Sequence, residues 1–292
     1  MLTVGPPPAV AAAAPRLSGA LGRVFTDTSP TAWDPALRPF LADLVRPFGT
    51  GLREDLLADG AGHSFGEMAE ALLPDLVGDR EPVDLLVLAY ALHDLRLGRS
   101  TAAHLSDRCP GRPAAFAVCD QGSAAAFTAV RLIESYFASG ACSRAVLLVV
   151  EQSALHYDLA VPAPLPDRHT AVGLRFDTEG APLTVRQRTA VEPARVAAVL
   201  AAEVAALRGD RADTTLIACA RLAGLLPPAV ADVVVAAEGQ PCTGVWYELA
   251  TGRPEGLVLL AEYEPGAGVL SLSALDVPAP VRPLADARAV AG

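Results

Sequence analysis

The chain has 292 residues, of which 52% are apolar and 19% are charged, and its formal net charge is −10. All 23 basic residues are arginines scattered along the sequence, so no basic patch is available to neutralise nucleic-acid phosphates. No window of eighteen apolar residues lacks a proline, glycine or charge, which argues against a transmembrane helix. The five cysteines show neither a CxxC pair nor metal-ligand spacing, so we expect free thiols, no metal site and a cytoplasmic location.

The first half alternates between amphipathic segments and short apolar runs. Residues 1–15 hold three consecutive prolines and no basic segment, which predicts an extended tail rather than a secretion signal. Helices are expected at residues 65–76, 101–105 and 123–138, and buried strands at 85–90, 114–118 and 145–150. Gly140 follows the third helix, where glycine supplies the left-handed C-cap.

The second half repeats this alternation more loosely and closes with a proline-rich tail from Pro278. A helix is expected at residues 192–207, and strands at 171–176, 215–218, 233–236, 257–261 and 269–275. Strands joined by helices through short connections predict an α/β protein with a mostly parallel sheet and helices on both faces.

Residues 65–158 resemble the N-terminal half of ketoacyl-ACP synthase III enzymes and their acyltransferase relatives. The helix that ends at Gly140, the strand at 145–150, and then Glu151 and Asp158 fall at the family's spacing. Counted back from Gly140, the family's nucleophile falls on Ser123.

The resemblance continues more weakly towards the C-terminus. Residues 167–174 lie where the family has a GDGAGA loop, residues 239–242 where it has a Gly-Asn-Thr motif, and residues 266–268 where it has its Gly-rich oxyanion turn. The resemblance implies a thiolase-like α/β fold with a five-layered αβαβα core. Its two similar βαβ-rich halves would be residues 1–160 and a shortened 161–292.

The chain also departs from the family. The family's condensing enzymes use a Cys, a His and an Asn, whereas this chain has Ser123 and Gln240 at two of these positions and no histidine after His169. Decarboxylative condensation depends on the His/Asn pair, so we do not expect an ordinary condensing enzyme.

Ser123 follows Gly122 at a predicted strand-to-helix turn, where backbone N–H groups and the helix dipole stabilise an oxyanion. The resemblance implies that the N–H of Ala267 is a second donor. A serine nucleophile needs a base, and the candidates are His169 and then His156. The alternative for His169 is that it only hydrogen-bonds neighbouring backbone.

Three further residues around the presumed pocket have open assignments. Asp120 could orient a base, bind an amine acceptor or cap the helix. Cys119 and Cys242 flank the pocket from the two halves, and either could be the nucleophile or an inert buried thiol.

The favoured function is an acyltransferase of polyketide or related specialised metabolism. It would take an acyl group from a carrier-protein or CoA thioester onto Ser123, with no permanently bound cofactor. Two alternatives remain: a non-catalytic thiolase-fold partner of a ketosynthase, and direct transfer in which His169 or Asp120 acts as the base. The resemblance also implies a two-fold homodimer.

Overall fold

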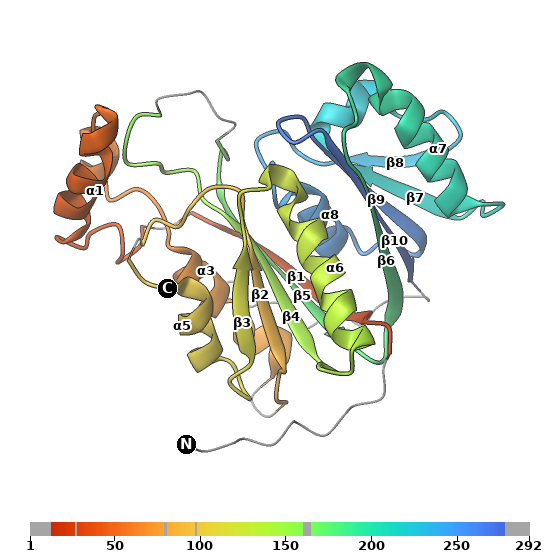
Figure 1. Ribbon diagram of the computed structural model, residues 1–292, viewed down its shortest axis with the longest axis horizontal. Helices are drawn as coiled ribbons and strands as arrows, with labels where there is room; N and C mark the ends of the chain where they lie inside the picture. The colour runs from red at the N-terminus through yellow and green to blue at the C-terminus, as the bar shows by residue number, and fades with distance from the viewer. Residues whose placement is uncertain (1–12, 27, 79–80, 97, 160–164, 278–292) are drawn as a thin grey trace.

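The computed structural model describes residues 13–26, 28–78, 81–96, 98–159 and 165–277 (Figure 1). Most of the predicted N-terminal tail and the tail from Pro278 lie outside the described residues. The strands are β1 (Arg16–Phe25), β2 (Leu85–Ala89), β3 (Ala114–Val118), β4 (Ala145–Glu151), β5 (His169–Asp177), β6 (Ala181–Arg188), β7 (Thr214–Ala218), β8 (Asp232–Val235), β9 (Gly256–Glu264) and β10 (Val269–Val277). The α-helices are α1 (Leu37–Val45), α2 (Glu54–Ala58), α3 (Phe65–Glu70), α4 (Leu73–Val77), α5 (Thr101–Arg108), α6 (Ala125–Ala138), α7 (Val196–Arg208) and α8 (Gly244–Gly252).

The strands are hydrogen-bonded in the order β3-β2-β4-β5-β1-β6-β10-β9-β7-β8. In the first half β3, β2 and β4 are parallel, and β5 and β1 continue antiparallel. In the second half β8, β7 and β9 are parallel, and β10 and β6 continue antiparallel. The two halves therefore use their five strands in the same order, and a short β1–β6 pairing joins them.

The helices complete five layers. Helices α6 and α8 lie in the middle and contact strands of both halves (Figure 1). Helices α3, α4 and α5 cover the outer face of the first half, and α7 covers that of the second. This αβαβα arrangement of two similar halves is the thiolase-like fold that the sequence predicted.

Local sequence explains the best-predicted elements. Strand β2 is apolar throughout and β4 is apolar up to its last residue, Glu151. Every residue of both strands is buried, as expected for strands with helices on both faces. The helix predicted at 65–76 is wrong in extent, because two short helices stand there, and Pro74 lies in the first turn of the second. Proline lacks the N–H that a continuous helix would need at this position. None of the helices in the described segments combines the length and apolar character needed to cross a membrane.

Candidate functional site

Ser123 lies on a tight turn between β3 and α6. Asp120 and Gly122 both adopt positive φ values, 61° and 53°, and residues 122–124 form one 3-10 turn that leads into α6. Left-handed backbone is tolerated by glycine and by aspartate better than by most residues. The turn places Ser123 in the middle layer at the N-terminus of α6, where only 1% of the residue is exposed.

The direct partner of Ser123 is Glu264, the last residue of β9. The amide N–H of Ser123 donates to Oε2 of Glu264 at 2.9 Å, and the hydroxyl of Ser123 lies 3.1 Å from the same oxygen. The N–H of Gly266 donates to Oε1 at 2.9 Å. A Cβ on Gly122 would lie 2.1 Å from Oε2, so the carboxylate fits only because residue 122 is glycine.

A second carboxyl group reaches Ser123 from the same strand. Glu262 precedes Glu264 by two residues, so both side chains leave the same face of β9. Glu262 is 3% exposed, and the Ser123 hydroxyl and the Cys219 thiol lie close enough to lower its pKa. Burial raises the pKa of Glu262 to about 8, so at neutral pH this group is mostly protonated and can donate a hydrogen bond.

The predicted Gly-Asn-Thr-like segment is held against the first half by hydrogen bonds. Oε2 of Glu151, at the end of β4, accepts the N–H of Cys242 at 2.9 Å, and Oε1 accepts the hydroxyl of Thr243. Gln240 Nε2 donates to Thr170 Oγ1 at 2.8 Å. Gln240 therefore anchors its turn to β5.

Burial makes Glu151 a pH-sensitive element of this anchor. Burial raises the pKa of Glu151 from 4.5 to about 7, so between these values the folded protein binds more protons than the unfolded chain. The protonation of Glu151 therefore contributes fully to the unfolding free energy below pH 4.5. This contribution, on the order of 3 kcal/mol, is lost as the pH rises through 7. We expect Glu151→Gln to lose less unfolding free energy than the wild type between pH 5 and pH 8 in denaturant titrations. Equal losses in both proteins, with exposed Glu255→Gln as control, would contradict this assignment.

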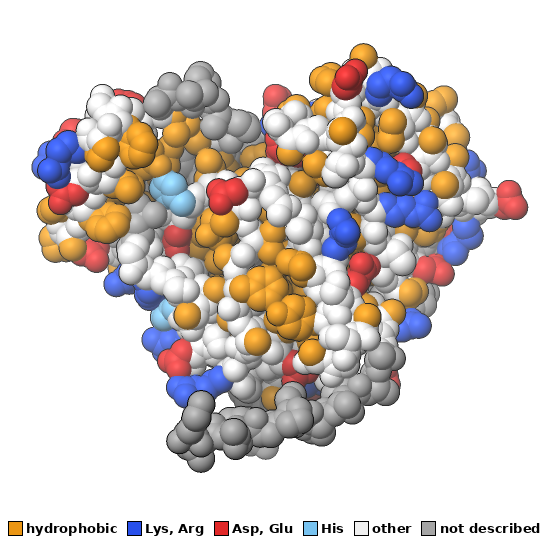
Figure 2. Space-filling view, in the orientation of Figure 1, with side chains coloured by type: hydrophobic (Ala, Val, Ile, Leu, Met, Phe, Trp, Pro, Cys, Tyr) orange, Lys and Arg blue, Asp and Glu red, His pale blue; other side chains and the backbone are white. Residues whose placement is uncertain are grey.

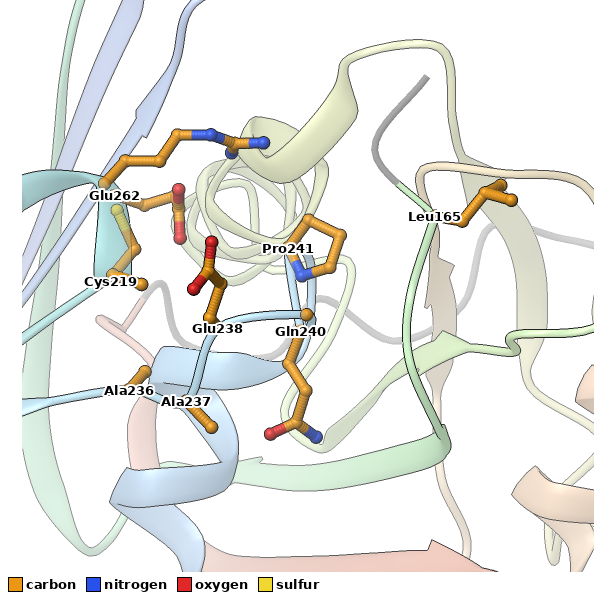
Figure 3. A pocket seen from close by; sticks show the side chains of 11 residues that line it. Leu165, Cys219, Ala236, Ala237, Glu238, Gln240, Pro241 and Glu262 are labelled. Carbon is orange, nitrogen blue, oxygen red and sulfur yellow. The ribbon is translucent and has the colours of Figure 1, made fainter. Parts of the chain in front are cut away.

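A cavity of about 370 Å³ adjoins the two carboxyl groups (Figure 3). It lies where β7 and β8 end, the edge at which open α/β sheets bind ligands. Cys219, Glu238 and Glu262 line it together with the apolar side chains of Leu165 and Pro241. Because Glu262 lines the cavity and its pKa also responds to the Ser123 hydroxyl, it connects the cavity to the serine.

The two candidate histidines have other partners. His169 Nδ1 accepts the N–H of Ser153 at 3.2 Å, and its ring lies edge-on to His63 at 4.9 Å. Burial and the neighbouring His63 lower the pKa of His169 to about 4. His156 donates from Nε2 to Ala61 O at 2.6 Å, and burial lowers its pKa. Among the described side chains, Ser123 hydrogen-bonds Glu264, and neither histidine is its partner.

The structure also shows the surroundings of Asp120, of the turn after β9 and of the two candidate cysteines. Asp120 does not cap the helix, because it is exposed at the left-handed turn and accepts the thiol of Cys119 at 3.4 Å. In the turn after β9 the N–H of Gly266 donates to Glu264, and the role of the Ala267 N–H as an oxyanion donor stays a prediction. Cys119 and Cys242 are free thiols, and burial with nearby glutamates raises the pKa of Cys242 well above its usual value.

Sequence reasoning did not select Glu262 and Glu264. The strand was expected to end at residue 261, immediately before them, although it continues to Glu264. The sequence does contain a signal for them, because Glu262 and Glu264 are two residues apart and directly follow an apolar run. A buried acid on a strand needs a partner or a function, so this pattern indicates a site.

The chain has a thiolase-like fold, and the solved structures that it resembles include ketoacyl synthase III enzymes. The acyltransferase ChlB3 is similar over 92% of this chain and 99% of its own, with 15% identity and a TM-score of 0.62. AbyA1, a tetronic acid condensing enzyme, is similar over 89% and 99%, with 20% identity and a TM-score of 0.60. The 3-oxoacyl-(acyl carrier protein) synthase III of Pseudomonas aeruginosa PAO1 is similar over 91% and 98%, with 16% identity and a TM-score of 0.56. No protein-family model and no curated protein sequence matches the chain.

Proposed function

We propose that the protein is an acyltransferase that accepts an acyl group from a carrier-protein or CoA thioester onto Ser123. The observation that carries this proposal is the hydrogen bond from the Ser123 hydroxyl to the Glu264 carboxylate at the N-terminus of α6. A serine hydroxyl becomes an effective nucleophile when an adjacent base can take its proton. The fold neighbours named as an acyltransferase and as condensing enzymes support the class of chemistry.

The proposed step balances without a cofactor. Ser123 Oγ attacks the thioester carbonyl as Glu264 accepts the hydroxyl proton. The C–S bond then breaks, and the proton passes from Glu264 to the leaving thiolate. Once Glu264 is protonated it holds the N–H of Ser123 less strongly, and that N–H becomes available to the oxyanion.

Intact-protein mass spectrometry after incubation with acyl-CoA and acyl-carrier-protein donors tests the proposal. We expect an acyl adduct on the wild type and on Ser139→Ala, an exposed serine at the far end of the middle helix, but none on Ser123→Ala. An equal adduct on Ser123→Ala, or none on the wild type, overturns covalent transfer through Ser123. Acyl transfer to an acceptor by Ser123→Ala would instead indicate direct transfer.

A specific observation also favours a second function, that of a non-catalytic partner of a ketosynthase. Glu264 occupies the backbone N–H groups of Ser123 and Gly266, which a substrate oxyanion would otherwise use. Strand β3 is the edge strand of the sheet, and Figure 2 shows hydrophobic side chains gathered over β3 and α6. The rings of Phe116 on β3 and Tyr136 on α6 are stacked, and Leu132 on α6 is exposed. We propose that this edge pairs with a ketosynthase or with a second copy of this chain. An absence of any adduct on the wild type would favour this function.

A further inference from the structure

The 370 Å³ cavity and Ser123 share one side chain, Glu262. The cavity is lined by Glu262 and Cys219, and Ser123, which is 1% exposed, is close enough to Glu262 to lower its pKa. A molecule in the cavity would therefore reach the serine oxygen through the Glu262 carboxyl group. This is the geometry of a group that can exchange protons with both the bound molecule and Ser123.

The charged groups on the cavity wall favour a cationic or hydrogen-bond-donating ligand. Glu238 and Glu262 both turn their carboxyl groups into the cavity (Figure 3), and Asp167 packs against Gly239 on its wall. Asp167 is ion-paired with Arg168, and Arg221, the single cation that lines the cavity among the described residues, acts on Glu262. Exposed Glu238 is therefore the carboxylate that remains for a cationic group of a ligand.

The remaining wall is small and apolar. Leu165, Ala236, Ala237 and Pro241 line it, and the cavity volume lies at the lower end of the range for small-molecule sites. A ligand that fits both parts of the wall has one apolar group and one basic nitrogen.

We propose that this cavity receives a small primary amine as the acyl acceptor and that Glu262 transfers the amine proton to Ser123. This inference rests on the proposed acylation of Ser123. The neutral amine attacks the ester carbonyl of acyl-Ser123, the C–N bond forms, and the bond from the carbonyl carbon to Ser123 Oγ breaks. The protonated Glu262 carboxyl group gives its proton to Oγ and takes the proton from nitrogen on its other oxygen, which leaves an amide, a free serine hydroxyl and Glu262 in its starting state.

Binding of matched probes to the unacylated protein tests the cavity independently of acylation. Isothermal titration calorimetry at pH 7.5 measures the dissociation constants of benzylamine, benzyl alcohol and benzoate. These three probes share a phenyl ring and carry a cationic, a neutral and an anionic group respectively. We expect benzylamine to bind about fivefold more tightly than benzyl alcohol, and Glu238→Gln to remove that difference, the size expected for one partly exposed ion pair. Glu255→Gln, an exposed glutamate outside the cavity, serves as control and should leave it unchanged. Equal binding of the amine and the alcohol, tighter binding of benzoate, or no effect of Glu238→Gln overturns the inference.

Discharge of the acyl-enzyme tests the reaction itself. We expect benzylamine, but not benzyl alcohol, to shorten the lifetime of acyl-Ser123, and Glu262→Gln to slow that discharge about 10²-fold, provided circular dichroism shows the variant folded. Failure to form acyl-Ser123 refutes the proposed function, and the binding measurement then still decides whether the cavity selects amines. An acyl-enzyme that forms but ignores benzylamine refutes the amine acceptor alone.

Discussion

Glu264→Gln is expected to slow acylation of Ser123 by about 10²–10⁴-fold, the usual contribution of a general base. The substitution keeps the size of the side chain and one oxygen for the N–H of Ser123 or Gly266. It removes the carboxylate that accepts the serine proton. The initial rate of adduct formation, measured by quenched-flow mass spectrometry at saturating donor, reports the effect.

The matched control is Glu255→Gln, in which the same change is made at an exposed position and the rate should stay at the wild-type value. Denaturant unfolding of both variants separates a loss of chemistry from a loss of fold. Faster acylation of Glu264→Gln than of the wild type would contradict the role of base. It would show that this carboxylate blocks the N–H of Ser123, as the partner function implies.

Ser123 could be selected from the sequence but its partner Glu264 could not, because the two residues are far apart along the chain. The helix and strand that follow Ser123 are local patterns, and the spacing of the resembling family, counted back from Gly140, places the nucleophile on Ser123. Glu264 lies 141 residues further on and reaches Ser123 only because the two halves pack around one middle layer. His169 is predicted as a base because its loop corresponds to one near the active site of the resembling family, whereas in the structure its ring packs against His63.

The largest miss in the fold is β1, the strand nearest the junction of the two halves. Its sequence contains Gly19 and Gly22, which weaken strand propensity, so no strand was expected there. The structure explains Gly22, because a Cβ at this position would lie 2.9 Å from the ring of Tyr247 on α8. The close packing of α8 on β1 requires glycine at position 22, although glycine disfavours a strand. This contact joins segments far apart in the sequence, so local propensity could not predict it.

The packing of α8 against α6 predicts a large loss of unfolding free energy when the aromatic contact between the two helices is removed. Trp246 is fully buried, and its ring lies 4.8 Å from that of Phe127, four residues after Ser123 on the middle helix. We expect Trp246→Ala to lower the unfolding free energy by about 3–5 kcal/mol, because it removes a large core side chain and leaves a cavity. Trp33→Ala, at the other tryptophan, which is 56% exposed, should cost less than about 1 kcal/mol. Denaturant titration of both variants measures the difference.

Trp246→Phe separates packing from polar contacts at the same position. The indole Nε1 has no hydrogen-bond partner among the described residues, so phenylalanine loses no hydrogen bond there and keeps most of the contact with Phe127. We therefore expect Trp246→Phe to retain most of the stability that Trp246→Ala loses. Phe127 lies one helical turn beyond Ser123, so Trp246→Ala should also slow acylation by loosening the turn that aligns the serine with Glu264. Equal stability of the Ala and Phe variants would show that the middle layer does not depend on this aromatic contact.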